Sequence, residues 1–403
     1  MTKLAVITSH PIQYYAPWFQ YLAQHTKLEL RVFYLWDFGV TEQVDAGFKR
    51  AVRWDLPLLD GYEYEFVPNS STRPGTGHFR GLQNPTLKRQ VTSFDPDVVL
   101  LLGYKYASML SFILRWRRTP LLFRGDSHRL VERGGTGERV RRTLISTLFK
   151  RFAAFLYVGQ ANLDYFRRHR VAPEKLFFAP HAVDNGRFQA ASDEAAQQAR
   201  EWRRELGIPE QHAVILFAGK LENKKRPQDL LAAFLQARPA ETTLLFVGNG
   251  ELEEQLKREA KSHPNIVFAP FQNQTQMPRT YAAADIFVLP SCGAGETWGL
   301  AINEAMCLSR PVIASTHVGC VQDLVRSHQN GLSFAPGDVA ALSECLTEAL
   351  GDRERLRVWG RESRRIISQY SYEQATTGLL QALDAVHRRA SYEIRSEESS
   401  ELG

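Results

Sequence analysis

The chain has 403 residues, of which 44% are hydrophobic and 23% charged, and its formal net charge is +6. This length favours two domains over one ordinary core, and the composition is typical of a soluble globular protein. The sequence argues against a membrane-spanning protein, because no apolar run approaches the roughly 18 residues that a span requires.

The charge is unevenly distributed along the chain. Residues 1–190 hold 27 Lys and Arg against 16 Asp and Glu, whereas the remaining residues hold 23 against 28. A basic first part predicts an acidic partner, which leaves an anionic membrane surface, a phosphorylated lipid, an acidic glycan or nucleic acid open.

The N-terminus and the cysteines bear on the compartment. MTKLAVITSHPIQYY lacks the long apolar region of a signal peptide and is typical of a strand, so we expect a cytoplasmic protein. The cysteines show neither CxxC nor Cys/His ligand spacing, which favours reduced residues over a structural metal site. They are Cys292, Cys307, Cys320 and Cys345.

The first half alternates short apolar runs with amphipathic stretches. Runs rich in Val, Leu and Ile without polar alternation are typical of strands buried on both faces of a parallel sheet. With helices between them, they predict βαβ units and a Rossmann-like domain over residues 1–188. The expected strands are 4–8, 28–35, 97–103, 120–124 and 153–159.

The second half repeats this pattern more clearly and predicts a second doubly wound domain over residues 189–370, with a hinge near 185–200. Its expected strands are 213–219, 243–248, 265–271, 285–291 and 310–315, and its expected helices are 227–237, 251–262, 276–283, 299–307 and 338–350.

The C-terminal end is expected in two parts. Residues 371–390 are predicted to form a helix that returns towards the N-terminal domain. The acidic, Ser-rich residues 391–403 are predicted to be disordered. Two doubly wound domains leave a cleft at the carboxyl ends of their strands, so the chemistry is expected on the loops there.

The clearest motif is GETWGLAINEAMCLSRPVIAS, which places Glu296 in a loop and Glu304 inside the following helix. The backbone amides around Trp298, Gly299 and Leu300 form the N-terminus of that helix. Such an end carries unpaired N–H groups and partial positive charge, which suit a diphosphate. A carboxylate before the helix is suited to sugar hydroxyls, and one two turns in to a ribose diol.

Two further motifs follow strands of the second half. In FAGKLENKKRP, a strand ends at Gly219, and Lys220 and Lys225 are placed to neutralise a diphosphate leaving group. In VGNGELE, Gly248 and Gly250 form half of a dinucleotide fingerprint without its third glycine. A plain tight turn explains that second motif equally well.

Taken in this order and spacing, GKLENKK, VGNGELE and the two glutamates resemble the retaining glycosyltransferases of family 4. The resemblance covers residues 213–350 and implies the GT-B fold, in which two Rossmann-like domains face an interdomain cleft. It implies a nucleotide-sugar donor held mainly by the C-terminal domain, an acceptor held mainly by the N-terminal domain, and no cofactor or metal.

The resemblance also assigns roles to residues. Glu296 is expected to contact the donor sugar, Glu304 the ribose, and Lys220 and Lys225 the diphosphate, with Thr297 in the same donor-binding loop. The family usually has Arg where this chain has Lys220, and Lys keeps the charge but loses the planar fork.

The acceptor side is less determined. The family often has His where this chain has Asp126, and His128 follows two residues later. Asp126 is a candidate for contact with the sugar or the acceptor, with a helix N-cap as the alternative. His128 and His10, the latter in the first βα loop, are further acceptor-side candidates. Asp95 and Asp97 resemble a metal-binding DxD, but their position just before a buried strand favours a strand entry.

Basic residues gather at 115–118 and 129–151. Within residues 138–152, Val140, Leu144, Leu148 and Phe152 recur at helical spacing. The pattern fits a core-packed helix with a solvated charged face. It also fits peripheral attachment to anionic lipid, on the inner face of the plasma membrane.

Together with these observations, the resemblance implies a retaining, metal-independent glycosyltransferase of hexosyltransferase type that transfers a sugar to a hydroxyl acceptor. Bacterial glycolipid, lipopolysaccharide or polysaccharide synthesis is the expected setting, with a glycan or lipid-linked acceptor and no nucleic acid. The alternatives are a nucleotide-sugar epimerase or phosphorylase of the same fold, and a non-catalytic basic binding module.

Overall fold

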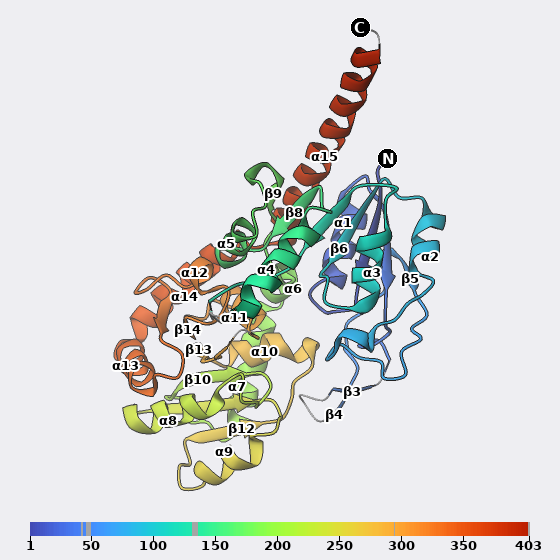
Figure 1. Ribbon diagram of the computed structural model, residues 1–403. Helices are drawn as coiled ribbons and strands as arrows, with labels where there is room; N and C mark the ends of the chain where they lie inside the picture. The colour runs from blue at the N-terminus through green and yellow to red at the C-terminus, as the bar shows by residue number, and fades with distance from the viewer. Residues whose placement is uncertain (42, 46–49, 131–135, 294, 402–403) are drawn as a thin grey trace.

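The computed structural model describes residues 1–41, 43–45, 50–130, 136–293 and 295–401. Within these ranges the chain forms two domains, each with a fully parallel sheet covered by helices (Figure 1). The predicted pair of Rossmann-like domains is confirmed.

The N-terminal sheet has seven strands in the order β5-β2-β1-β6-β7-β8-β9. Its central strands are those that the apolar runs predicted. The edge strands β5 and β9 escaped prediction because they are short, and β5 (EYEF) is half polar and partly exposed. The strands are β1 (Lys3–Thr8), β2 (Glu29–Tyr34), β5 (Glu63–Phe66), β6 (Val98–Leu102), β7 (Leu121–Arg124), β8 (Ala154–Tyr157) and β9 (Leu176–Phe178).

Helices cover both faces of this sheet, and an antiparallel pair, β3 (Gln43–Asp45) and β4 (Arg50–Val52), is separate from it. The helices are α1 (Ala16–His25), η1 (Phe79–Gly81), α2 (Leu87–Phe94), α3 (Ala107–Arg115), α4 (Thr136–Phe149), α5 (Gln160–Arg168) and η2 (Pro173–Lys175).

The C-terminal sheet has six strands in the order β12-β11-β10-β13-β14-β15. Ala218 of β10 pairs with Val247 of β11, so the glycines that follow these two strands lie level at the carboxyl edge. The strands are β10 (Ala213–Ala218), β11 (Thr242–Val247), β12 (Ile266–Ala269), β13 (Ile286–Leu289), β14 (Val312–Ser315) and β15 (Gly331–Phe334).

The helices of this domain include two in the segment where the hinge was expected. Phe188 and Trp202, from these first two helices, are buried in the C-terminal core. The helices are α6 (Asn185–Ala190), α7 (Ser192–Glu205), α8 (Pro227–Ala237), α9 (Glu253–Glu259), η3 (Gln274–Gln276), α10 (Met277–Ala282), α11 (Leu300–Cys307), α12 (Val321–Leu324), α13 (Val339–Leu350) and α14 (Arg353–Ile367).

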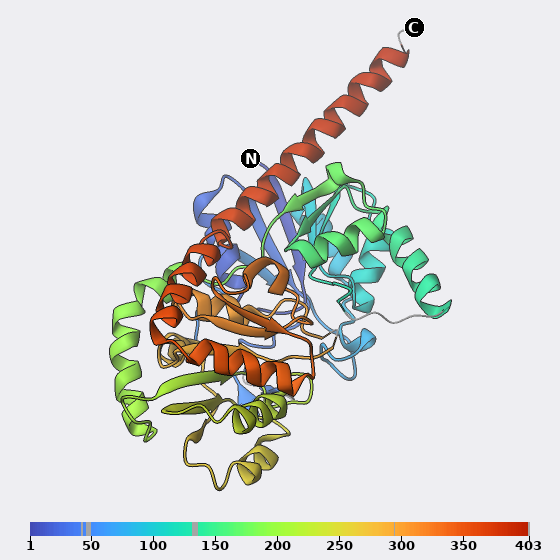
Figure 2. The same ribbon diagram turned by 90° about the vertical axis from the view of Figure 1, so that its left-hand side faces the viewer.

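The last helix, α15 (Tyr372–Glu401), packs on the N-terminal domain through Ala375, Leu379 and Leu383 and then projects away from the body (Figure 2). It therefore continues through 391–401, where the sequence predicted disorder; Glu and Arg are good helix formers. Residues 402–403 lie outside the described residues. Among the described helices, none is both long and apolar enough to cross a membrane.

Candidate active site

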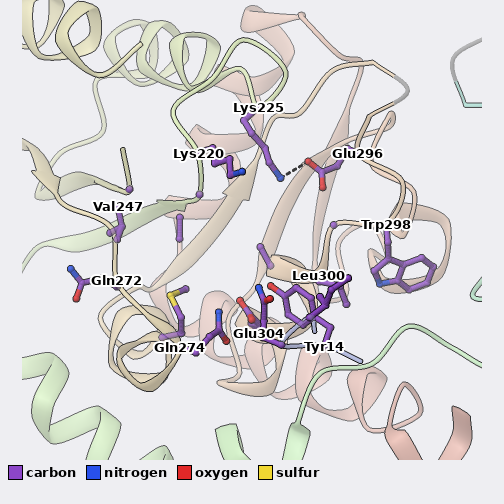
Figure 3. Close-up of a pocket in the computed structure, with 18 of the residues that line it drawn as sticks. Tyr14, Lys220, Lys225, Val247, Gln272, Gln274, Glu296, Trp298, Leu300 and Glu304 are labelled. Atoms are coloured by element: carbon purple, nitrogen blue, oxygen red, sulfur yellow. Dashed lines mark hydrogen bonds and ion pairs between the residues drawn. The ribbon is translucent and has the colours of Figure 1, made fainter. Parts of the chain in front are cut away.

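A cavity of about 650 Å³ lies where the carboxyl edges of the two sheets meet, and residues of both domains line it. The C-terminal wall comes from the loops after β10, β11, β12 and β13 and from the start of α11. The N-terminal wall comes mainly from the loops after β1 and β7. Figure 3 shows its two ends, with Val247 and Gln272 at one and Trp298 at the other. The cavity is thus the interdomain cleft that the sequence predicted.

An ion pair stands in the wall of this cavity. The Nζ of Lys225, from the loop after β10, lies 2.5 Å from Oε2 of Glu296, from the loop after β13 (Figure 3). The Ser291 hydroxyl donates to the same oxygen at 2.9 Å. Burial works to raise the pKa of Glu296, but the charges of Lys225 and Lys224 and the Ser291 hydrogen bond outweigh it and lower that pKa. Glu296 is therefore a charged acceptor at neutral pH.

A second lysine and two glycines also line this wall of the cavity. Lys220 lines the cavity beside Gly219 and Gly248, which follow the adjacent strands β10 and β11. A Cβ on Gly248 would lie 2.0 Å from the carbonyl oxygen of Gly219, so the two turns pack together only because Gly248 has no side chain. Gly250 does not line the cavity; it packs against the backbone of Leu221.

The N-terminus of α11 opens into the cavity. Gly299 is its N-cap in the left-handed conformation (φ 99°), and a Cβ there would meet Val318 at 2.6 Å. Thr297, Trp298, Gly299 and Leu300 all line the cavity, as the donor-binding motif predicted. The first amides of a helix have no partner within it and carry partial positive charge, so this end is suited to a phosphate.

Glu304 lies one turn further along α11 and is 2% exposed. The Tyr281 hydroxyl donates to its Oε2 at 2.7 Å, whereas Oε1 has no hydrogen-bond partner in the described parts of the chain. Burial raises the pKa of Glu304 above its ordinary value, against the lowering effects of Tyr281, Arg187 and Tyr14. A buried oxygen without a partner is costly, and a ligand hydroxyl would satisfy it.

On the N-terminal wall, Asp126 follows β7 and keeps 38% of its side-chain surface exposed. Its Oδ2 accepts from the Thr297 hydroxyl at 2.7 Å and lies 3.4 Å from Nε2 of His181. Burial works to raise the pKa of Asp126, but these two contacts lower it to about 2. Asp126 therefore bridges the domains as a carboxylate and is not a helix N-cap.

The two histidine candidates lie outside the set that lines the cavity. His128 bridges the domains: its Nε2 lies 3.2 Å from the backbone carbonyl of Glu296, and its Nδ1 accepts from the amide of Leu130. His10 packs against Trp36 and Phe38, with its Nδ1 2.9 Å from the Ser9 hydroxyl. The first βα loop reaches the cavity through Ile12–Tyr15 instead.

Residues 53–55 of the N-terminal domain cross the cleft and contact the C-terminal domain beside the Val247 and Gln272 end of the cavity. The Arg53 carbonyl accepts from Asn273 at 2.8 Å, and Asp55 accepts from the Thr275 hydroxyl at 2.5 Å. Between them, Trp54 lines the cavity, its ring 6.3 Å from that of Phe271. We call residues 53–55 the clasp, because they join the domains beside the Val247 and Gln272 end.

Sequence reasoning missed Tyr14, His181 and Trp54, which all line the cavity. Tyr14 and His181 lie in the stretches SHPIQYYAP and HAVDNGRF, which follow β1 and β9, so polar side chains after a strand were the available signal. Trp54 had no such signal, because the clasp is neither in a motif nor directly after a predicted strand.

The Asp95–Asp97 pair lies away from this cavity. Asp97 accepts from the Lys3 amide at 2.8 Å, at the amino end of β6, and Asp95 forms an exposed ion pair with Arg118 at 3.2 Å. Both are structural contacts at the sheet edge opposite the cleft. Over the described residues, no three His, Cys, Asp or Glu side chains are grouped so as to hold a metal ion.

Parts of the sequence, and the fold as a whole, are similar to those of known proteins. Residues 198–366 match the family glycosyl transferases group 1. A D-inositol 3-phosphate glycosyltransferase from Nocardioides sp. is 32% identical over 246 residues, 55% of this chain and 50% of that protein. Sulfoquinovosyl transferase SQD2 from Arabidopsis thaliana is 29% identical over 232 residues, 52% of this chain and 44% of that protein.

The crystal structure of HepE from Anabaena in complex with UDP and glucose covers 95% of this chain and 100% of its own, with a TM-score of 0.70 at 18% identity. The GT-B fold and the resemblance to glycosyltransferases are thereby confirmed. The chain spans about half the length of the curated relatives that it matches.

Proposed function

We propose that this chain, whose C-terminal domain carries the match to glycosyl transferases group 1, is a retaining, metal-independent glycosyltransferase of family 4 type. The donor is a nucleoside diphosphate sugar and the acceptor is a hydroxyl group. The observation that carries the proposal is one cavity wall that combines lysines, a helix N-terminus, a charged Glu296 and a buried Glu304 with an unpartnered oxygen.

The donor is placed by matching its groups to this wall. The diphosphate lies between Lys220, Lys225 and the first amides of α11, because these supply the positive charge. The ribose then meets Oε1 of Glu304, and the base extends towards Val247 and Gln272. The sugar lies towards Glu296, whose carboxylate accepts from its hydroxyls. UDP bound to HepE, a protein of the same fold, supports a nucleotide in this cleft.

The transfer step follows from this placement. The bond between the anomeric carbon and the diphosphate oxygen breaks, and the acceptor oxygen forms its bond on the same face of the sugar. The acceptor proton passes to the leaving diphosphate, whose new charge Lys220, Lys225 and the α11 amides stabilise. Asp126 faces the cavity as a carboxylate and is suited to accept a hydroxyl of the sugar or the acceptor.

The test is a thermal-shift panel of nucleotide sugars in EDTA, followed by a transfer assay with glycan and lipid-linked acceptors. A ligand that binds the native state raises the melting temperature by mass action. Stabilisation by one nucleotide sugar and transfer with retained anomeric configuration are expected. Absence of any stabilisation would contradict the proposal, and turnover of the donor without acceptor would indicate an epimerase.

We also propose that the enzyme works in the cytoplasm, bound peripherally to an anionic membrane such as the inner face of the plasma membrane. The basic segment 115–118 and 129–151 supports this, although residues 131–135 lie outside the described residues. In α4, Val140 is 60% and Leu144 66% exposed, so they do not pack into the core. A glycan or lipid-linked acceptor of bacterial glycolipid, lipopolysaccharide or polysaccharide synthesis fits this location.

A further inference from the structure

A second cavity, of about 430 Å³, lies on the N-terminal domain between α4, the end of α5 and η2. It is next to the amino ends of β8 and β9, because α4 and η2 directly precede these strands. The active cavity opens at the carboxyl ends of the sheet, so the two sites are on opposite edges. The second cavity is therefore separate from the proposed donor site.

The lining of this second cavity is strongly cationic. Five of its side chains are basic, and among the described residues no Asp or Glu lines it. We call it the basic pocket; its cations are Arg142, Lys150, Arg168, Arg170 and Lys175. Within the described ranges, Arg142, Lys150 and Arg170 have no ion pair with a carboxylate. Like charges gathered in one concavity repel one another, and a bound anion would relieve that repulsion.

The chemistry of the lining suits a phosphate group. Arginine donates in a planar fork that matches phosphate oxygens, and the Thr147 hydroxyl adds a donor at the rim. His169, 5% exposed, forms part of the lining, and its Nδ1 lies 3.1 Å from the Ser146 hydroxyl. Burial lowers the pKa of His169 to about 4, and the charges of Arg129 and Arg142 add to that effect. The ring is therefore neutral and leaves the arginines and lysines as the charges of the site.

Beside the basic pocket, α4 presents an exposed apolar pair. At 100° per residue, Ser146, Lys150, Thr143 and Thr147 form one continuous stripe of the helix, and Val140 and Leu144 form the next. Two aliphatic side chains that are mostly exposed border the rim on which Thr147 lies. A free phosphate ion would leave this pair in water, whereas acyl chains joined to the phosphate would cover it.

We propose that the basic pocket binds the phosphate group of an anionic phospholipid, with Val140 and Leu144 in contact with its acyl region. The site extends the proposed membrane attachment and gives it a specific headgroup contact. It does not depend on sugar transfer, since vesicle binding is measured without donor or acceptor.

The experiment uses the full chain and vesicles of phosphatidylcholine with or without phosphatidic acid. The variant Arg142→Glu/Arg170→Glu is expected to weaken binding to the anionic vesicles by about tenfold or more, because each cation near an anionic surface adds to the attraction. The matched control Arg357→Glu/Arg361→Glu, on α14 of the other domain, makes the same charge change and is expected to bind nearly as well as the unaltered chain. Unchanged melting temperatures establish that the variants are folded.

A second variant separates lipid from free phosphate. Leu144→Ser is expected to weaken vesicle binding several-fold while inorganic phosphate still raises its melting temperature; the double arginine variant is expected to lose both effects. Equal losses of vesicle binding in the double arginine variant and in the control would contradict binding at the basic pocket. They would indicate that the overall charge of the protein attracts it to the anionic surface. Full vesicle binding by Leu144→Ser would contradict the contact with acyl chains and would indicate a site for free phosphate. Absence of vesicle binding by the unaltered chain would overturn the membrane attachment as well.

Discussion

The two walls of the active cavity are built in different ways. The C-terminal wall consists of tight turns after strands and one helix terminus, and its central contact, Lys225 to Glu296, lies within one domain. The N-terminal wall reaches the site through contacts that cross the cleft, such as Asp126 to Thr297 and Asp55 to Thr275. The central contact of the C-terminal wall is therefore held within one domain, whereas the N-terminal side chains are positioned by contacts across the cleft.

This difference has a consequence for kinetics. Changes in the C-terminal wall are expected to alter donor binding and the stabilisation of the leaving group. Changes in the N-terminal wall are expected to alter steps that need closure and to leave donor affinity less affected. Measurements on both walls decide whether that division holds.

The largest effect is expected for Lys225→Ala. It removes a cation from the diphosphate and leaves the buried Glu296 without its ion-pair partner, so kcat should fall by about 100–1000-fold. A matched control is Lys257→Ala, which breaks an exposed pair with Glu253 and should leave kcat unchanged. Steady-state transfer kinetics measure both. A Lys225→Ala enzyme within threefold of the unaltered rate would exclude the lysine from leaving-group stabilisation.

Glu304→Ala tests the ribose contact in the same wall. Donor binding is expected to weaken by about 1–3 kcal/mol, the cost of removing a hydrogen bond to a charged group. Glu304→Gln keeps one carbonyl oxygen and should lose less. Calorimetric titration with the donor measures the difference, and equal affinity in all three proteins would remove Glu304 from the donor site.

How well each wall of the active cavity could be predicted from the sequence depends on how that wall is built. Strand, glycine, cation and helix start are fixed in relative position by local geometry, so residues as far apart as Lys220 and Glu304 were correctly brought to one cavity. Likewise, the buried strands β1, β6, β10 and β13 were evident from their apolar runs. The polar edge strand β5 and the short β15 lack that pattern and escaped prediction.

The N-terminal wall depends on how two domains dock, which no local pattern encodes. His128, an acceptor-side candidate, lies between the two domains, but its ring bridges to the carbonyl of Glu296 and does not line the cavity. His10 faces aromatic neighbours, and Tyr14, four residues later, lines the cavity in its place. The clasp around Trp54 results from contacts with residues more than 200 positions away in the sequence.

Asp126→Asn tests the contribution of the N-terminal wall. The variant keeps the shape of the side chain but removes its charge, so kcat should fall by about tenfold with little change in donor affinity. Because the pKa of Asp126 is about 2, its protonation should not appear in the rate profile above about pH 4. Asp164→Asn, on the exposed face of α5, is the control. A loss of donor affinity as large as that of Glu304→Ala would contradict the division between the walls.

A smaller effect is expected for the clasp. Trp54→Ala removes an aromatic surface at the nucleotide end, and the donor KM should rise by roughly three- to tenfold, since an aromatic contact contributes about 0.5–1.5 kcal/mol beyond burial. Trp54→Phe should retain most of the affinity. A sugar 1-phosphate, which lacks the nucleoside, serves as a probe whose weaker binding should be unaffected by either variant. Loss of binding for both ligands would indicate that the clasp holds the domains closed and does not contact the nucleotide.

The smallest expected effect is that of removing metal ions. In the proposed transfer the leaving diphosphate meets Lys220, Lys225 and the amides of α11, so positive charge is supplied by the protein at the atoms where negative charge develops. The C-terminal wall thus supplies what a divalent cation supplies to other nucleotide-sugar enzymes, and excess EDTA should leave kcat/KM unchanged. Loss of activity in EDTA that Mg²⁺ or Mn²⁺ restores would contradict the proposed mechanism. In that case the carboxylates of the cleft, Glu296 and Asp126, become the first candidates for metal contact, and the C-terminal wall is not complete on its own.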